Sequence, residues 1–340
     1  MSAIGVTFAS FSALGSARGL GAARLAADLG YGSFWTAEAS AMDGFTMLAA
    51  AGVAAPSLDL GTGVLPIQLR SPLLVAMTAA TLQDLHPDRD VLVGVGMSSP
   101  VITERWHGVP YLPDGTTPLA YMRAYLTVLR SLLAGEEVTT TDGPIRLRGA
   151  QLGVRLRDRR PKTVLAALNP RMLALAGELA DGVLLNYLPA SHVAWSVEQV
   201  RRGEAAAGRP AGSCTVYAYV HVGVGDAEAS RDRARRDLWS YAVVDGYARN
   251  FDRAGYTTEI AGVREASARR DRAAAIAAIS ERMCDDIDVM GDEDLVRNTV
   301  AAYLTAGVDH AVVMPLPWGE DRMGVVEATL RAVAPLADGV

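Results

Sequence analysis

Two glycine-containing segments, residues 61–64 and 94–98, are the parts of the sequence best suited to hold a flat ligand. Glycine carries no side chain, so the backbone at these positions can approach a ligand closely. The sequence has no HExxH or GxSxG motif and no pair of carboxylates at an obvious spacing. Nucleophilic, metal-assisted and glycosidic mechanisms therefore lack candidate residues, and no metal site is expected. These features favour a cofactor enzyme, in which the protein positions a group that does the chemistry.

Three residues could transfer a proton beside such a ligand: Glu38, Glu104 and His107. Glu38 follows a predicted strand, where it could be a general acid, a ligand contact or an ordinary ion-paired carboxylate. Glu104 and His107 follow another predicted strand. An imidazole titrates near neutral pH and can donate a proton, but His107 can equally be interpreted as an ordinary loop histidine. The remaining histidines are interpreted as structural, namely His86, His192, His221 and His310.

The elements that must position these residues alternate between short apolar strands and amphipathic helices. Eight main strands are predicted, at residues 4–8, 33–36, 58–65, 91–95, 164–168, 183–186, 215–224 and 309–314. Alternation of strands and helices predicts a parallel sheet, and eight such units fit a (β/α)8 TIM barrel. An open doubly wound sheet is the alternative, but no complete GxGxxG motif follows the first strand. We interpret residues 1–340 as one domain with insertions at 99–117, 137–160 and 242–290.

Composition limits the class of protein. The formal net charge is −6, which argues against nucleic-acid binding and against electrostatic binding to a membrane. Half of the residues are hydrophobic, but no run reaches the length of a membrane span. The two cysteines, Cys214 and Cys284, are far apart in the sequence and fit a reducing compartment. The start of the chain lacks the basic residues of a signal peptide, so a cytoplasmic protein is expected.

Several segments resemble the luciferase-like oxidoreductases. The similarity is specific within residues 58–98 and 162–187 and diffuse within 225–290. It is carried by Leu60-Gly61-Thr62-Gly63-Val64-Leu65-Pro66, Arg70-Ser71-Pro72-Leu73, Val93-Gly94-Val95-Gly96-Met97-Ser98 and Ala166-Ala167-Leu168-Asn169-Pro170. The resemblance continues in the segment Ala176-Gly177-Glu178-Leu179-Ala180-Asp181-Gly182. Within this family the sequence is most similar to the coenzyme F420 branch, which includes methylenetetrahydromethanopterin reductase.

The resemblance implies a bacterial-luciferase-like barrel that binds F420, with FMN as the alternative, and a non-proline cis peptide at Gly63–Val64. It also implies a homodimer. Residues at the strand ends would bind the cofactor, namely Thr62, Gly63, Val64, Gly96, Met97, Ser98, Ala167, Leu168, Asn169 and Asn186. Asn169 could also cap a helix, and Asn186 could instead bind a substrate oxygen. Where some F420 proteins carry residues for proton transfer, this sequence has Glu38-Ala39-Ser40, so the proton donor is unassigned.

Three functions follow from these observations. The first is an F420-dependent oxidoreductase that transfers a hydride between the deazaflavin and a small organic substrate with an activated C=C, C=N or C=O bond. The second is an FMN-dependent monooxygenase that uses O2. The third is a barrel that binds F420 without catalysis, against which the intact segments at residues 61–64 and 94–98 argue.

Overall fold

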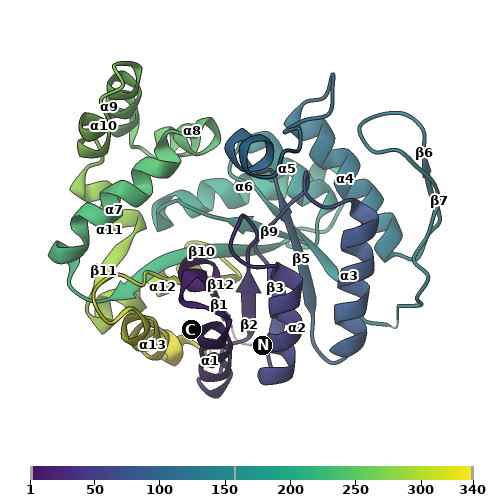
Figure 1. Ribbon diagram of the computed structural model, residues 1–340, viewed down its shortest axis with the longest axis horizontal. Coiled ribbons are helices and arrows are strands. Elements are labelled where there is room, and N and C mark those ends of the chain that lie inside the picture. Colours follow the sequence, from purple (N-terminus) through teal and green to yellow (C-terminus); the bar gives the residue numbers. More distant parts are fainter. Residues whose placement is uncertain (1–2, 157, 338–340) are drawn as a thin grey trace.

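A closed barrel of eight parallel strands forms the centre of the molecule (Figure 1). The computed structural model describes residues 3–156 and 158–337. Around the barrel the order is β1, β2, β3, β5, β8, β9, β10 and β12, and β12 pairs with β1 to close it. The bounds are Ile4–Thr7, Ser33–Thr36, Asp59–Thr62, Val91–Gly96, Lys162–Ala166, Gly182–Leu185, Thr215–Val224 and His310–Pro315. The predicted TIM barrel is confirmed.

An outer ring of helices covers the strands. It consists of α1 (Ser16–Asp28), α2 (Gly44–Ala54), α3 (Pro72–Leu85), α4 (Pro118–Leu133), α5 (Pro170–Leu179), α6 (Ala190–Ala206), α12 (Glu293–Thr305) and α13 (Arg322–Val333). Local signals in the sequence set several starts. The Ser71 side chain accepts a hydrogen bond from the Leu74 backbone at the start of α3, and Thr117 caps α4 in the same way. Proline follows each cap, where its missing N–H costs nothing.

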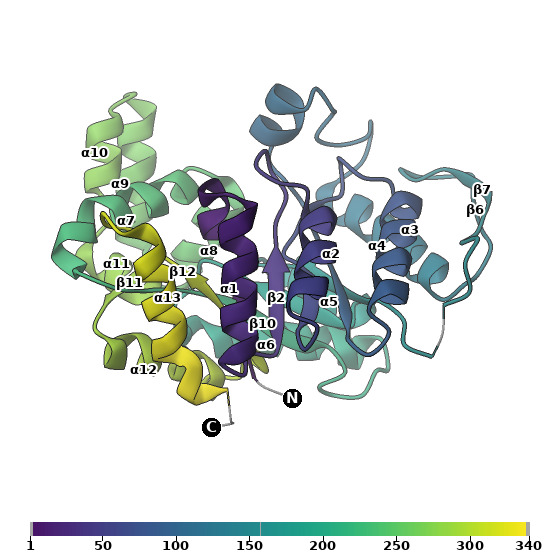
Figure 2. The same ribbon diagram turned by 60° about the horizontal axis from the view of Figure 1, so that its bottom comes forward.

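The predicted insertions take different forms. The Asp142-Gly143 pair in the 137–160 insertion is typical of a hairpin turn, and residues 138–150 form a hairpin of β6 (Val138–Thr140) and β7 (Leu147–Ala150). Short turns of helix, η1 (Ala9–Leu14), η2 (Val101–Trp106) and η3 (Ala334–Leu336), lie elsewhere. Beyond β10 the chain forms α7 (Ala227–Ala242), α8 (Asp245–Arg253), α9 (Thr257–Ala268), α10 (Arg272–Ala277) and α11 (Glu281–Ile287). Figure 2 shows these helices grouped on one side of the barrel.

Two details of the strands differ from the prediction. The expected strand at residues 58–65 is interrupted after Thr62, and the chain resumes as β4 (Leu65–Pro66), which pairs with β5. The interruption falls at Gly63–Val64, whose peptide bond is cis, as the resemblance implies. A further short strand, β11 (Val289–Gly291), extends the sheet by pairing with the far end of β10. Three residues are too few for a recognisable strand pattern, so β11 was not predicted.

Large side chains fill the inside of the barrel. Trp35, Leu184 and Tyr219 belong to one buried cluster there, and the Trp35 indole donates to Ser33 Oγ at 2.7 Å. Filling the interior with side chains makes this barrel a packed core, so ligands can enter only at an end.

The N-terminal end of the barrel carries an ion-pair cluster. The ammonium group of Lys162, at the start of β8, and the guanidinium of Arg159 both contact the carboxylate of Asp90. Burial alone would raise the pKa of Asp90, but Lys162 and Arg159 lower it below its ordinary value. Lys162 is the only lysine in the sequence. Within the described residues, no helix combines the length and the apolar character that crossing a membrane requires.

Candidate active site

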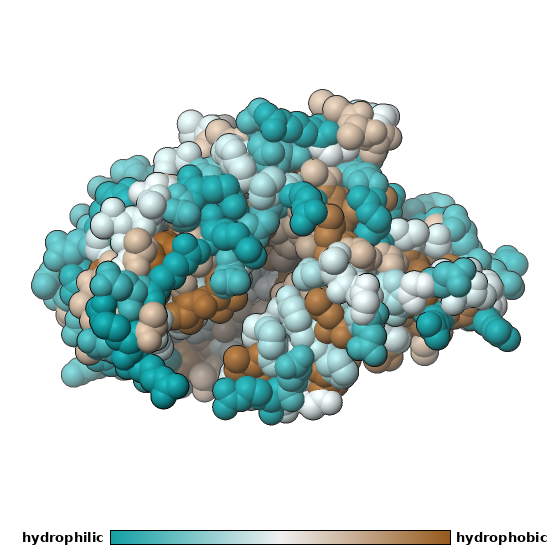
Figure 3. All heavy atoms as spheres, turned by 90° about the horizontal axis from the view of Figure 1, so that it is seen from above, coloured by the Kyte–Doolittle hydropathy of each residue, from teal (hydrophilic) through white to brown (hydrophobic). Residues whose placement is uncertain are grey.

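The carboxyl ends of the barrel strands open into a hollow with apolar patches on its walls (Figure 3). The strands point toward this end of the molecule in Figure 1, and Figure 3 looks onto it. Ligands of TIM barrels bind at this end, because the loops that follow the strands meet there. The predicted site residues lie in these loops and strand ends.

The cis peptide at Gly63–Val64 is held by hydrogen bonds from β10 and from the loop after β2. The Tyr219 hydroxyl donates to the Gly63 carbonyl at 2.7 Å and accepts from the Thr7 hydroxyl at 3.2 Å. The Glu38 backbone N–H donates to the Val64 carbonyl at 3.2 Å. These bonds occupy the backbone carbonyl oxygens of both residues. A ligand would therefore meet the partly exposed side chain of Val64 rather than a free backbone acceptor.

Small residues surround Val64. An added Cβ at Gly96 would lie 2.7 Å from Val64 Cγ2 and 3.3 Å from Ala166 Cβ, so these three residues adjoin one another. Thr62 is different, because it is fully buried and its hydroxyl exchanges hydrogen bonds with the Gly94 backbone at 2.8 and 2.9 Å. Thr62 thus joins β3 to β5 beneath the site, while Val64, Gly96 and Ala166 form its floor.

The next predicted residues line the floor's edge. Met97 and Ser98 follow β5 and are partly exposed. Gln68 contacts both residues. The Gln68 amide nitrogen lies 3.9 Å from Met97 Sδ, and the Gln68 amide oxygen accepts a hydrogen bond from Ser98 N at 3.4 Å. Ala167 is buried, and Leu168 is partly exposed after β8. Three of these four side chains are thus accessible from the strand ends.

Arg253 lies at the N-terminus of α5. Asn169 does not cap the helix with its side chain; its Oδ1 accepts from Arg253 Nη2 at 2.8 Å. Arg253 also donates to the Leu168 carbonyl and lies over the Trp195 ring. Arg253 forms no ion pair with any carboxylate in residues 3–156 or 158–337. A guanidinium without a carboxylate partner beside a helix start favours phosphate or carboxylate.

His192 adds to this arrangement. Its ring stacks on Trp195, and its buried Nε2 has no hydrogen-bond partner among the described residues. Burial, followed by the positive charge of Arg253, lowers the pKa of His192 to about 4. A neutral histidine with an unsatisfied ring nitrogen is available to a ligand that reaches this site.

Glu38 is engaged by a structural ion pair. Arg70 binds both oxygens of its carboxylate, at 2.8 and 2.7 Å, and the Gly44 N–H donates to Oε1 at 2.8 Å. Arg70 also contacts Asp43, which caps α2 through Thr46 N. This is the ion-paired alternative considered for Glu38, and it fixes the loop between β2 and α2.

Glu104 and His107 lie on the exposed surface of the loop after β5. His107 Nε2 contacts the Ala39 carbonyl at 2.7 Å, and Glu104 Oε1 accepts from Tyr111 N at 3.3 Å. The first contact ties the β5 loop to the β2 loop, while both side chains remain exposed. The structure therefore places these two predicted residues at the rim of the hollow and not on its floor.

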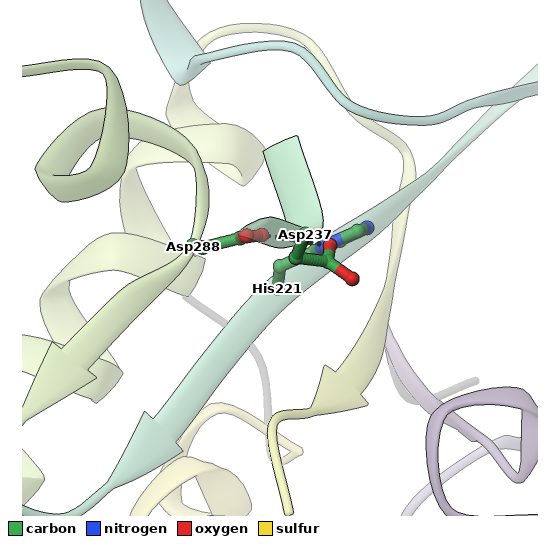
Figure 4. Close-up of side chains that lie close together, drawn as sticks. All are labelled: His221, Asp237 and Asp288. Carbon is green, nitrogen blue, oxygen red and sulfur yellow. Dashed lines mark hydrogen bonds and ion pairs between the residues drawn. The ribbon is translucent and has the colours of Figure 1, made fainter. Parts of the chain in front are cut away.

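A buried polar network lies beside the hollow. His221 of β10, Asp237 of α7 and Asp288, just before β11, converge so that one ligand-type atom from each lies within 4.8 Å of the others (Figure 4). His221 Nδ1 contacts Asp288 at 3.0 Å, and Asp237 accepts from the Tyr187 hydroxyl at 2.7 Å. The Tyr187 ring packs against the His221 ring. This aromatic packing helps to bury His221, which is 2% exposed.

Hydrogen bonding indicates where the protons of this network reside. Asn186 Oδ1 accepts from Tyr187 N at 2.9 Å and lies 2.8 Å from His221 Nε2, so Nε2 carries the proton. Burial lowers the pKa of His221 to about 4, which leaves the ring neutral and Nδ1 an acceptor. Burial raises the pKa of Asp288 to about 8, so this acid can donate to Nδ1. Burial, followed by the charge of Asp288, raises the pKa of Asp237 to about 7.

Asp237 also borders a cavity of about 720 Å³ that lies between α7 and the loops after β1 and β12. Its carboxyl is therefore the member of the network that open space reaches, whereas His221 and Asp288 are almost fully buried. A carboxylic acid that titrates near neutral pH at the wall of a cavity can act as a general acid.

Comparisons with known proteins agree with this fold. A family model described as luciferase-like monooxygenase matches residues 11–310. The chain belongs to the luciferase-like family. Rv3520c of Mycobacterium tuberculosis, provisionally named a coenzyme F420-dependent oxidoreductase, is 31% identical to it over 85% of this chain and 88% of its own. The 5,10-methylenetetrahydromethanopterin reductase of Methanopyrus kandleri is 26% identical, with 85% of each chain covered. The solved structure of the coenzyme F420 dependent tetrahydromethanopterin reductase from that organism covers 99% of both chains with a TM-score of 0.79 and 22% identity.

Sequence reasoning on this luciferase-like chain missed Asp237 and Asp288 and treated His221 as structural only. The three residues come from separate elements, and no local spacing joins them. One signal was present: Tyr217, Tyr219 and His221 alternate along one strand, as side chains on a single face do. Arg253 was also missed, because it belongs to the region where the resemblance is diffuse.

Proposed function

We propose that this protein is an F420-dependent oxidoreductase that transfers a hydride between F420 and a small organic substrate with an activated C=C, C=N or C=O bond. The observation that carries the proposal is the pairing, at one barrel mouth, of a floor of small residues with an anion site at Asn169 and Arg253. F420 has a flat ring and a polyanionic tail, so both parts of the cofactor find a matching surface. The similarity to relatives named for F420 supports F420 over FMN.

Each part of the mouth would have its own role. When bound, F420 would supply the redox chemistry, because its deazaflavin ring accepts or donates a hydride. Val64 would support one face of the ring, and Gly96 and Met97 would border it. The N-terminus of α5, with Asn169 and Arg253, would hold the anionic tail.

Reduction of a polarised double bond also needs a proton, and we assign its donor to Asp237. This carboxyl reaches the cavity, and its pKa of about 7 leaves part of it protonated at neutral pH. Asp288 and His221 would position it and share its proton. Glu104 and His107, at the rim of the hollow, remain the predicted alternatives for the proton donor. Glu38, held by Arg70, acts in this proposal as a positioning residue.

Titration of the purified protein with F420 and, separately, with FMN tests the cofactor. We expect F420 fluorescence to change saturably at micromolar concentration or below, and FMN fluorescence to stay constant. Binding of FMN alone would overturn the proposal in favour of an oxygen-dependent monooxygenase. Binding of F420 without turnover of any activated alkene, imine or ketone would favour the non-catalytic barrel.

An Asp237→Asn variant tests the proton donor. The amide keeps the size of the side chain but cannot donate an acidic proton. We expect F420 binding to persist and turnover to fall by roughly 10²-fold or more, the usual contribution of a general acid. Unchanged turnover would contradict the assignment, and Glu104→Gln and His107→Gln would then be the variants to compare.

A further inference from the structure

Three arginines line the cavity beside α7. Arg233 and Arg236 project from α7, and Arg322 begins α13 on the other side. The acidic residues of the lining are Asp232 and Asp237, and burial keeps Asp237 partly neutral near pH 7. Three guanidinium groups therefore face at most two negative charges across a volume of about 720 Å³.

The arginines of α7 divide into two sets. Arg231 pairs with Asp285, and Arg235 lies 3.5 Å from Glu281, so these two bind the acidic face of α11. Arg233 and Arg236 form no ion pair with any carboxylate of the described chain, and neither does Arg322, whose Nε donates to the Pro317 carbonyl. Folding thus pairs the arginines that face α11 and leaves those at the cavity without an ion pair.

A second observation points into the same cavity. The hydroxyl of Ser10, in the loop after β1, is shielded from solvent and has no hydrogen-bond partner among the described residues. Buried hydroxyl groups are normally bonded, and Ser10 lines the cavity, so a bound group toward which its hydroxyl turned would satisfy it. Trp318 adds an apolar wall from the loop after β12. The lining therefore suits a small organic molecule with an oxyanion at one end.

We propose that this cavity is the substrate pocket and that Arg233, Arg236 and Arg322 bind a carboxylate or phosphate group of the substrate. The substrate class is then an anionic organic molecule whose unsaturated bond lies near Asp237. This inference rests on the proposed function in that it assigns the anion to the substrate of the F420 reaction. The tail of F420 is assigned elsewhere, because neither Asn169 nor Arg253 is among the residues that line this cavity.

The test is a titration of the full-length protein with inorganic phosphate and with succinate, with and without F420, at constant ionic strength. Tryptophan emission reports binding, since Trp318 lines the cavity, and a Trp318→Phe variant assigns the signal. We expect saturable binding in the unaltered protein. An Arg233→Gln/Arg236→Gln double variant should bind both anions at least about tenfold more weakly, because bonds to charged groups are lost. The matched control is Arg264→Gln, an exposed arginine of α9.

The outcomes separate the two sources of the anion. Unchanged F420 affinity in the double variant supports a substrate site. The double variant could instead bind F420 more weakly while its affinity for a deazaflavin that lacks the phosphate tail stays unchanged. The cavity would then bind the cofactor tail, and the inference would be overturned. Absence of saturable phosphate and succinate binding also overturns it. Failure of F420 to bind the unaltered protein would overturn only the proposed cofactor, because the phosphate titration does not depend on it.

Discussion

The bidentate contact between Glu38 and Arg70 places a nearly buried carboxylate in the loop after β2, at the edge of the candidate site. The Glu38 side chain is 11% exposed and that of Arg70 is 16% exposed. An Arg70→Met variant would leave this carboxylate without its counter-charge. We expect the free energy of unfolding to fall by about 2–3 kcal/mol, somewhat less than for a fully buried pair. Urea denaturation measures the loss, and Arg24→Met, at an exposed arginine of α1, is the matched control.

Glu38→Gln distinguishes positioning from catalysis at the same residue. If Glu38 only holds the loop, this variant should lose stability, and its turnover should follow the fraction of folded protein. A variant that keeps full stability and loses turnover would instead identify Glu38 as catalytic.

The network around His221 predicts a pH dependence of stability. Burial raises the pKa of Asp237 to about 7 and of Asp288 to about 8, so the folded protein keeps protons that the unfolded chain has released above about pH 4. This contribution to the free energy of unfolding therefore falls as the pH rises. The pKa of His221 is lowered to about 4, so its contribution to the free energy of unfolding rises with pH. This effect is confined to pH values below about 6.5, where the histidine of the unfolded chain is protonated.

Between pH 6.5 and 8 only Asp237 and Asp288, and not His221, change the pH dependence of the free energy of unfolding. We expect the cluster to lower the free energy of unfolding by on the order of 1–2 kcal/mol over this interval. Denaturation at a series of pH values should show a flatter profile for Asp288→Asn, and an unchanged one for the exposed control Asp84→Asn. Parallel profiles for all three proteins would contradict the assignment of raised pKa values to this cluster.

Individual site residues were predictable only where the chain is locally distinctive. Gly63, Val64 and Gly96 follow recognisable strands, and Asn169 precedes a proline that starts a helix. The partners that complete the site were not predictable in this way. Arg253 reaches Asn169 from a distant helix, and Asp237 meets His221 only after the chain has folded around the barrel. Tertiary contacts of this kind leave no pattern in a short window of sequence.

At the scale of elements, α5 and α6 contact each other through glycines. An added Cβ at Gly177 would lie 2.0 Å from the Val200 carbonyl oxygen, and one at Gly203 would lie 1.9 Å from that of Ala174. Gly177→Ala must therefore push the helices apart, and we expect a loss of about 1–3 kcal/mol in the free energy of unfolding. This shift would also disturb the N-terminus of α5, where the proposed anion site lies.

Gly21→Ala is the matched control for Gly177→Ala. Gly21 is exposed in α1, and an added Cβ there meets no atom within 4 Å. Alanine has the higher helix propensity, so we expect a gain of about 0.5–1 kcal/mol. Urea denaturation of both variants gives the comparison. A gain for both would show that the two helices can separate without cost.

The elements themselves were largely predictable, since buried parallel strands are short apolar runs bounded by glycine, proline and polar residues. All eight barrel strands and the hairpin around Gly143 lie where the pattern indicates. The exceptions have physical causes. The strand at residues 58–65 contains a cis bond that hydrophobic periodicity does not reveal, and β11 is too short to show alternation.

At the scale of the whole molecule, α2 and α3 present an apolar outer face. Leu74, Met77 and Leu85 are exposed along α3, and Val53 is 80% exposed on α2 beside it. Exposed apolar patches of this kind mark association surfaces. We expect a homodimer through this face, so Met77→Glu should produce monomers in sedimentation velocity. Val154→Glu, an exposed valine of the 137–160 insertion, should leave the dimer intact. A monomeric unaltered protein would contradict this expectation.

The single lysine at the base of the barrel has a practical consequence. Its side chain is 48% exposed, and it lies at the opposite end of β8 from the candidate site. Apart from the terminal amine, reagents that acylate amino groups have only this target in the chain. A fluorophore or a biosensor surface coupled at Lys162 would therefore be attached at one defined point, with the mouth of the barrel facing away from the attachment. Binding of F420, phosphate or succinate could then be followed on uniformly oriented molecules without introducing a cysteine.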